Sequence, residues 1–138
     1  MRQSRETEEV ETRGPGFYDL TPAAHSFVER QGVGDGLLTV FIHHTSASLL
    51  IQENADPDVQ RDLLDALARL APEDAGWRHR SEGPDDMPAH VKGALTQTHL
   101  QIPVAAGRLD LGTWQGIYLV EHRARPHRRR LTFHLIGD

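Results

Sequence analysis

Apolar and polar residues alternate with a period of two in several stretches of this chain, and such spacing is typical of strands. Three stretches of this kind predict antiparallel strands around residues 100–104, 117–121 and 131–135. A nearly continuous apolar run at 36–43 predicts a buried central strand, and residues 48–51 predict a second strand after a bend. These predicted strands make an antiparallel sheet the main element of the fold.

The N-terminal residues carry a weaker strand pattern. Residues 3–12 are polar but include Val10 and β-branched threonines, and Phe17 and Tyr18 follow a Gly-Pro-Gly turn. A polar strand of this kind is typical of a sheet edge, where one side of the strand faces solvent. We therefore expect an edge strand here.

Two helices are predicted by a capping residue followed by proline. Thr21-Pro22 predicts a short helix that ends before Gly32. Asp56-Pro57 repeats the signal, and the second helix continues until Pro72. Its apolar residues lie on one face and are Val59, Leu63, Leu67 and Leu70.

A third helix is predicted over residues 85–96, after a loop at 73–84 that is mainly polar. Gly93 weakens the helix propensity of this segment. Strands and about three helices in irregular order indicate an α+β fold, and 138 residues suit a compact single domain over 1–138.

Composition narrows the chemistry. The chain has no cysteine, which excludes disulfides, thiolate metal ligands and cysteine nucleophiles, so histidine and carboxylate must hold any metal. A formal net charge of -5 argues against general affinity for nucleic acid. No apolar run approaches the length of a membrane span. We therefore expect a cytoplasmic protein with neither a membrane nor a nucleic-acid partner.

Histidines at two places are candidates for a site. His43 and His44 follow the most apolar predicted strand, and in a strand they point to opposite faces, so only one of them can face a given cleft. His90 lies near the start of the third predicted helix, where free N–H groups attract anions. The alternative for each is a structural or exposed ring. We expect His44 and His90 to share a pocket.

Cationic residues offer a second kind of signal. Residues 123–130 form an arginine-rich turn between two predicted strands, and arginine forks match phosphate oxygens. The alternative is a solvated hairpin tip. Lys92 is the only lysine of the chain, and we expect it to act on an anionic ligand.

An aromatic residue and an amide stand together at 112–116. Trp114 lies between glycines beside Gln115, and this pair could stack on a heteroaromatic ring and bond to its edge, although a tryptophan more often fills a core. No glycine-rich nucleotide loop and no Gly-x-Ser-x-Gly elbow is present.

Three segments, taken in order and with their spacing, resemble the YjbQ family over nearly the whole chain. They are His44-Thr45-Ser46-Ala47-Ser48-Leu49 running into Glu53-Asn54-Ala55-Asp56-Pro57, then residues 82–92, and Gly112-Thr113-Trp114-Gln115-Gly116-Ile117 with Glu121-His122-Arg123. The resemblance implies a YjbQ-like α+β fold in a homotrimer. It also implies a secondary thiamine-phosphate synthase activity, which joins a pyrimidine-methyl diphosphate to a thiazole phosphate and releases pyrophosphate.

The family's polar signature, carried over by position, gives the candidate site residues. The expected catalytic residues are His44, His90, Asp56 and Asp86. Asp56 and Asp86 would hold Mg²⁺ directly or through water, and His44 with His90 would manage protons or bind a metal. The expected substrate- and phosphate-binding residues are Thr45, Ser46, Asn54, Lys92, Trp114, Gln115, Arg123, Arg129 and Arg130.

Two alternatives to a synthase remain open. In a metal-assisted hydrolase, His44, His90 and Glu121 would hold a divalent ion such as Zn²⁺ that activates water. A non-catalytic trimeric module would bind a small phosphorylated metabolite without turnover. Dependence of any turnover on zinc or magnesium separates the first two readings, and binding without turnover favours the third.

Overall fold

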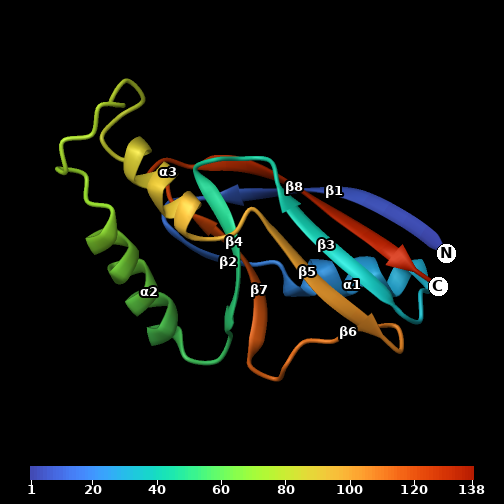
Figure 1. Ribbon diagram of the computed structural model, residues 1–138. Coiled ribbons are helices and arrows are strands. Elements are labelled where there is room, and N and C mark those ends of the chain that lie inside the picture. Colours follow the sequence, from blue (N-terminus) through green and yellow to red (C-terminus); the bar gives the residue numbers. More distant parts are fainter.

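A computed structural model describes residues 1–138 as two antiparallel sheets with three helices (Figure 1). The strands are β1 (Arg2–Thr12), β2 (Gly16–Asp19), β3 (Gly36–Ile42), β4 (Ala47–Glu53), β5 (His99–Ala105), β6 (Arg108–Leu109), β7 (Gln115–Glu121) and β8 (His127–Gly137). The helices are α1 (Thr21–Gln31), α2 (Pro57–Leu70) and α3 (Asp86–Leu95). The α+β class with three helices and mainly antiparallel strands is therefore confirmed. No helix has both the length and the apolar character needed to cross a membrane.

The five-stranded sheet has the order β1-β8-β3-β5-β6, so the apolar strand β3 is central as predicted. Only one of its faces is buried, however. Leu38, Val40 and Ile42 point into the core, whereas Leu37 and Phe41 are 39% and 41% exposed on the outer face. The expectation of a fully buried strand was wrong because a short apolar run does not show whether the second face of a sheet is covered.

The three-stranded sheet has the order β2-β7-β4. The chain passes between the two sheets three times before α2, because the consecutive strands β1, β2, β3 and β4 alternate between the sheets. The predicted N-terminal edge strand is therefore two strands, each at the edge of its own sheet. Residues 43–46 form the short connection from β3 to β4.

Helix α1 packs on the core through Phe27, whose ring lies 5.7 Å from that of Phe133 between centroids. Its predicted N-cap was wrong. Leu20 occupies the cap position, and the Thr21 hydroxyl instead accepts a hydrogen bond from the Ile117 N–H at 2.8 Å. A tertiary partner on β7 takes the hydroxyl that local sequence assigns to the cap.

Helix α2 begins as predicted, because the Asp56 carboxylate accepts a hydrogen bond from the Asp58 N–H at 2.9 Å and Pro57 occupies the first turn. No residue of α2 is buried, and Leu70 at its end is 66% exposed. Figure 1 shows α2 lying to one side of the two sheets. Its apolar stripe therefore has little contact with the rest of the chain.

Helix α3 approaches the β3–β4 connection closely. A Cβ added at Gly93 would lie 2.9 Å from the Thr45 carbonyl oxygen, closer than real Cβ contacts. The glycine that weakens helix propensity thus permits the contact between α3 and residues 43–46.

Candidate functional site

Three side chains converge at the N-terminal end of α3. The cluster consists of His79, Asp86 and His90, and one ligand atom of each lies within 4.8 Å of the other two. Asp86 and His90 stand one helical turn apart on the same face. His79 comes from the loop before α3, which turns back at Gly83 with a φ of 104°. We call these three residues the open cluster, because both imidazoles reach solvent.

The hydrogen bonds around the open cluster suit a metal. Both imidazoles contact Asp86 Oδ2 through Nε2, at 2.7 Å from His79 and 3.2 Å from His90. The other nitrogen of His90, Nδ1, donates to the Thr45 carbonyl oxygen at 3.2 Å. Nε2 donates its proton to Asp86 Oδ2; a bound cation would replace that proton, and the Nδ1–H bond to Thr45 would keep the ring oriented, as in histidines that ligate metals.

Arg123 holds the carboxylates beside this cluster. Its guanidinium donates to Asp86 Oδ1 at 2.7 Å and to Asp85 Oδ2 at 3.0 Å. Burial alone would raise the pKa of Asp86, but the hydrogen bond from His79 and the charges of His90 and Arg123 outweigh it and hold the pKa below its usual value. Asp86 is therefore ionised at neutral pH, with Oδ2 directed to the two histidines.

Two hollows adjoin the histidines of the open cluster. One, of about 390 Å³, is lined by His79, Trp77 and Arg80 among others. The other, of about 290 Å³, is lined by both His44 and His90. His44 and His90 thus border one pocket, as the sequence predicts.

A second polar cluster joins β7, β8 and β1 and is closed to solvent. Glu121 is fully buried and accepts hydrogen bonds from the Arg129 guanidinium at 2.7 and 2.5 Å and from the Thr12 hydroxyl at 2.6 Å. Arg129 also donates to the Ser46 carbonyl oxygen at 3.2 Å. Burial would raise the pKa of Glu121, but the bonds from Arg129 and Thr12 lower it, so the pair is ionic. We call Glu121, Arg129 and Thr12 the closed cluster.

His44 adjoins the closed cluster. Its Nε2 accepts a hydrogen bond from the Arg130 N–H at 2.8 Å, so in the neutral ring the proton lies on Nδ1. Burial and the nearby charge of Arg129 lower the pKa of His44. Neither nitrogen then offers a lone pair to a metal. The ligand atoms of His44, His90 and Glu121, the set predicted from the sequence, do not come together within 4.8 Å as those of the open cluster do.

The remaining predicted residues fall into two groups. Lys92 is half-buried on α3, where burial lowers its pKa against the charges of Glu73 and Asp85. Asn54, Asp56, Trp114 and Gln115 lie instead at the opposite end of the β4–β7 ladder, which pairs Ala47 with Glu121 at one end and Glu53 with Gln115 at the other.

At that far end the polar residues hold the local backbone. The Gln115 side-chain oxygen accepts from the Gly112 N–H at 2.8 Å, and Asn54 contacts the Thr113 carbonyl oxygen at 3.4 Å. Trp114 is 63% exposed, so it does not fill the core. Six residue steps separate the two ends of the ladder, or roughly 20 Å at the rise of a strand. One chain therefore does not unite all the predicted residues in one cavity.

Sequence reasoning missed His79, which lies inside the predicted loop at 73–84. The signal that was available is the spacing of Asp86 and His90, which places a carboxylate and an imidazole on one helix face. No periodicity predicts that a loop returns to that face, so the third member of the cluster needed the structure.

The whole chain is similar to known proteins. A family model described as UPF0047 protein YjbQ-like matches residues 6–138. A UPF0047 protein of Synechocystis is 51% identical over 100% of this chain and 95% of its own length. The UPF0047 protein YjbQ of Escherichia coli O157:H7 is 38% identical over 94% of each chain.

Solved structures agree with the sequence comparison. The crystal structure of a YjbQ/UPF0047 family protein from Clostridium acetobutylicum superposes with a TM-score of 0.89 at 38% identity, covering 95% of this chain and 99% of that chain. A Thermus thermophilus protein described as a conserved hypothetical protein gives a TM-score of 0.82, again at 38% identity and over 95% and 99% of the two chains.

Proposed function

The chain belongs to the UPF0047 YjbQ-like family, and on that basis we propose that it is a metal-dependent enzyme acting on a small phosphorylated metabolite. The convergence of His79, Asp86 and His90 carries the proposal, because two imidazoles and one carboxylate are a common ligand set for a divalent transition metal. Magnesium prefers oxygen ligands, so the cluster favours Zn²⁺ or a similar ion.

The residues around the cluster support this role. The Thr45 carbonyl oxygen fixes the His90 ring, and Arg123 keeps Asp86 ionised. When bound, a divalent ion would polarise a phosphate oxygen and lower the pKa of a bound water. The adjoining hollow is lined by Arg80 and Trp77, together with the carboxylates of Glu73 and Asp74, so a guanidinium and an aromatic side chain are available there to a phosphorylated molecule.

The first candidate reaction is thiamine-phosphate synthesis, which the sequence resemblance supports. In this reaction the bond from the pyrimidine methylene to the diphosphate oxygen breaks, the thiazole nitrogen bonds to that carbon, and pyrophosphate leaves. The protein must neutralise the departing charge and align two rings. In our proposal Lys92 and Arg80 would neutralise the charge of the departing pyrophosphate. Trp114 and Gln115 would receive one of the two rings.

A homotrimer would reconcile the two distant groups of residues. Trp114 lies roughly 20 Å from the Glu121 end of the β4–β7 ladder within one chain. We propose that a neighbouring subunit supplies Trp114 and Gln115 to the open cluster. The exposed Trp114 and the unburied apolar stripe of α2 support an interface between copies. Sedimentation equilibrium at micromolar concentration tests the trimer, and a monomer would contradict it.

The second candidate reaction is metal-assisted hydrolysis of a phosphate ester. The open cluster favours it because the imidazole-rich ligand set and the exposed histidines suit a metal that carries water. Both candidates use the same cluster, so the choice between them rests on the second substrate.

One assay separates the candidates. Metal-free protein is reloaded with zinc or magnesium and given pyrimidine-methyl diphosphate, with and without the thiazole phosphate. Pyrophosphate release that needs the thiazole partner supports the synthase, and phosphate release without it supports the hydrolase. His79→Ala should abolish either, whereas His99→Ala changes an exposed histidine outside the cluster and should not. Full turnover in metal-free protein would contradict the proposal.

A further inference from the structure

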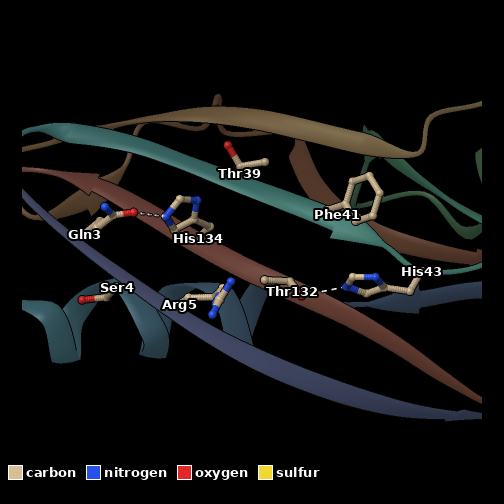
Figure 2. A pocket seen from close by; sticks show the side chains of 8 residues that line it. All are labelled: Gln3, Ser4, Arg5, Thr39, Phe41, His43, Thr132 and His134. Carbon is tan, nitrogen blue, oxygen red and sulfur yellow. Dashed lines mark hydrogen bonds between the residues drawn. The ribbon is translucent and has the colours of Figure 1, made fainter.

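A groove of about 630 Å³ crosses the outer face of the five-stranded sheet, on the side away from the core (Figure 2). Its walls come from β1, β8 and β3, whose outward residues alternate with those that face the core. His43 lines this groove, while His44, the next residue, lies beside the buried Arg129. The groove is therefore separate from the open cluster.

The groove is lined by cationic and neutral residues in an acidic protein. The chain has 20 acidic and 15 basic residues, yet no carboxylate is among the residues that line this hollow. Arg5 contributes a full positive charge, and His43 and His134 contribute imidazoles. A concave surface with this lining attracts anions.

Arg5 is the unpaired member of its neighbourhood. Arg30 forms an ion pair with Glu6, and Arg128 with Glu9 and Glu11 on the same strand pair. Arg5 makes no ion pair and no hydrogen bond. Its cross-strand partner is His134, so the guanidinium and this imidazole lie on adjacent strands at the same level. A free guanidinium is the group that binds phosphate oxygens through two parallel bonds.

Hydrogen bonds fix the two imidazoles in place. His134 Nε2 lies 2.9 Å from Gln3 Oε1, and His43 Nε2 lies 2.8 Å from the Thr132 hydroxyl, as the dashed lines in Figure 2 show. These bonds occupy one nitrogen of each ring, and Nδ1 of each ring has no protein partner. The rings are thus oriented before any ligand arrives, which lowers the entropic cost of binding.

An apolar wall closes one side of the groove. Phe41 is 41% exposed and meets His43 edge to face, with 5.0 Å between ring centroids. A large exposed aromatic side chain in a groove with the unpaired Arg5 guanidinium suits a ligand that has both an anionic and an apolar part.

We propose that this groove binds a phosphomonoester of an apolar or aromatic group. Arg5 pairs with the phosphate oxygens and Phe41 packs against the organic part. His43 donates to the phosphate through Nδ1, and His134 does so in its imidazolium form, because its Nε2 proton is held by Gln3 Oε1. A phosphomonoester carries close to two negative charges at neutral pH. It therefore suits a groove with one guanidinium and two imidazoles better than a ligand with a single carboxylate would. This site goes beyond the proposed enzyme activity, because none of its residues belongs to the open cluster.

Calorimetric titration of the full chain with phenyl phosphate, inorganic phosphate and benzoate tests the proposal. Phenyl phosphate should bind about tenfold more tightly than either of the others, since only it offers both a dianion and a ring. Arg5→Gln should weaken phenyl phosphate at least tenfold, because it removes the charged fork. Phe41→Ser should remove the preference for phenyl phosphate over inorganic phosphate.

Matched controls locate the binding. Arg69→Gln removes the same charge from an exposed position on α2 and should leave the affinity unchanged. His79→Ala in the presence of a chelator should also leave it unchanged, which separates this groove from the metal site. The proposal would be overturned if phenyl phosphate did not bind at millimolar concentration, or if Arg5→Gln bound it as tightly as the unchanged protein. It would also be overturned if Arg5→Gln changed the oligomeric state and the unchanged protein bound no phosphate.

Discussion

The closed and open clusters both contain a buried carboxylate paired with an arginine, and they differ in whether the other partners of the carboxylate are exposed to solvent. Glu121 and Asp86 are both buried carboxylates held by an arginine, with 0% and 4% exposure. Glu121 receives its bonds from Arg129, Thr12 and backbone N–H groups, all from inside the fold. Asp86 receives two of its bonds from His79 and His90, whose side chains are 43% and 33% exposed.

The difference shows what marks a candidate site in this protein. Burial and charge pairing occur in both clusters, so neither distinguishes structure from function. The open cluster has partners that can give up a hydrogen bond to a cation without leaving a buried charge alone. The closed cluster cannot lose a partner in this way, so we assign it to stability.

The largest effect is expected from breaking the closed cluster. Arg129→Met removes the partner of the fully buried Glu121 and should lower the free energy of unfolding by about 3–5 kcal/mol, as for other buried ion pairs. Urea denaturation measures the loss. Arg130→Met, at the exposed neighbouring position, should change stability by no more than about 0.5 kcal/mol. Equal losses in the two variants would mean that the closed cluster has no special role in stability.

The next effect is a loss of stability in acid from His122, beside the closed cluster. Burial lowers its pKa to about 4 from an ordinary value of 6.5, and its Nε2 lies 2.8 Å from the Ser48 hydroxyl. The unfolded chain therefore takes up this proton at higher pH than the folded chain. Stability is complete above about pH 6.5 and falls as the pH drops towards 4, by about 3 kcal/mol from this group.

His122→Phe removes this titration and sharpens the assignment. Glu121 and Asp86 have lowered pKa values, so their protonation in acid also destabilises the fold. This loss is the same in the unchanged protein and in His122→Phe. Unfolding free energies at pH 7 and pH 4 should therefore differ by about 3 kcal/mol less in the variant. A difference that persists unchanged would show that His122 is not the group responsible.

A third effect concerns the open cluster. Zinc at about a hundred times its dissociation constant should stabilise the folded protein by about 2.7 kcal/mol and raise the melting temperature by several degrees. A chelator should reverse the shift, and His79→Ala or His90→Ala should abolish it. His43→Ala, outside both clusters, provides the control. A zinc-dependent shift that survives loss of His79 would place the metal elsewhere.

The smallest effect is expected at Lys92, which lies between the two clusters. Its charge acts on His122, and those of Glu73 and Asp85 act on Lys92. Lys92→Arg should weaken binding of inorganic pyrophosphate to the zinc-loaded protein by roughly tenfold, about 1.4 kcal/mol, because a planar fork replaces a compact ammonium. Lys92→Met should lose more, with little change in melting temperature. Unaltered binding in Lys92→Met would make the lysine a surface charge.

Much of the fold could be predicted because it depends on local spacing. The cap at Asp56, the period-two strands and the short third helix follow from residues close in sequence. The division into two sheets could not, because β3 and β4 are adjacent in sequence and yet pair with different strands. The exposure of Leu37 and Phe41 could not be predicted for a similar reason. An apolar run indicates a strand, but it does not show whether other elements cover both faces of that strand.

The site was predictable only where one element carries it. Asp86 and His90 lie on one helix and are among the predicted residues, whereas His79 reaches them from a loop. Glu121 ends an apolar strand and precedes several arginines, and nothing in the sequence shows that its partner is the one eight residues later. Pairings of this kind depend on tertiary register, which a single sequence does not reveal.

The connection at residues 43–46 has a consequence for how these regions respond to one another. His43 serves the outer groove, His44 and Ser46 contact Arg129, and the Thr45 carbonyl oxygen holds His90. Because these four residues are consecutive in the chain, we expect a ligand that shifts this segment from one side to change the affinity on the other. Thermodynamic linkage then requires the coupling to be reciprocal: a phosphomonoester that tightens zinc binding must itself bind more tightly to the zinc-loaded protein, by the same factor.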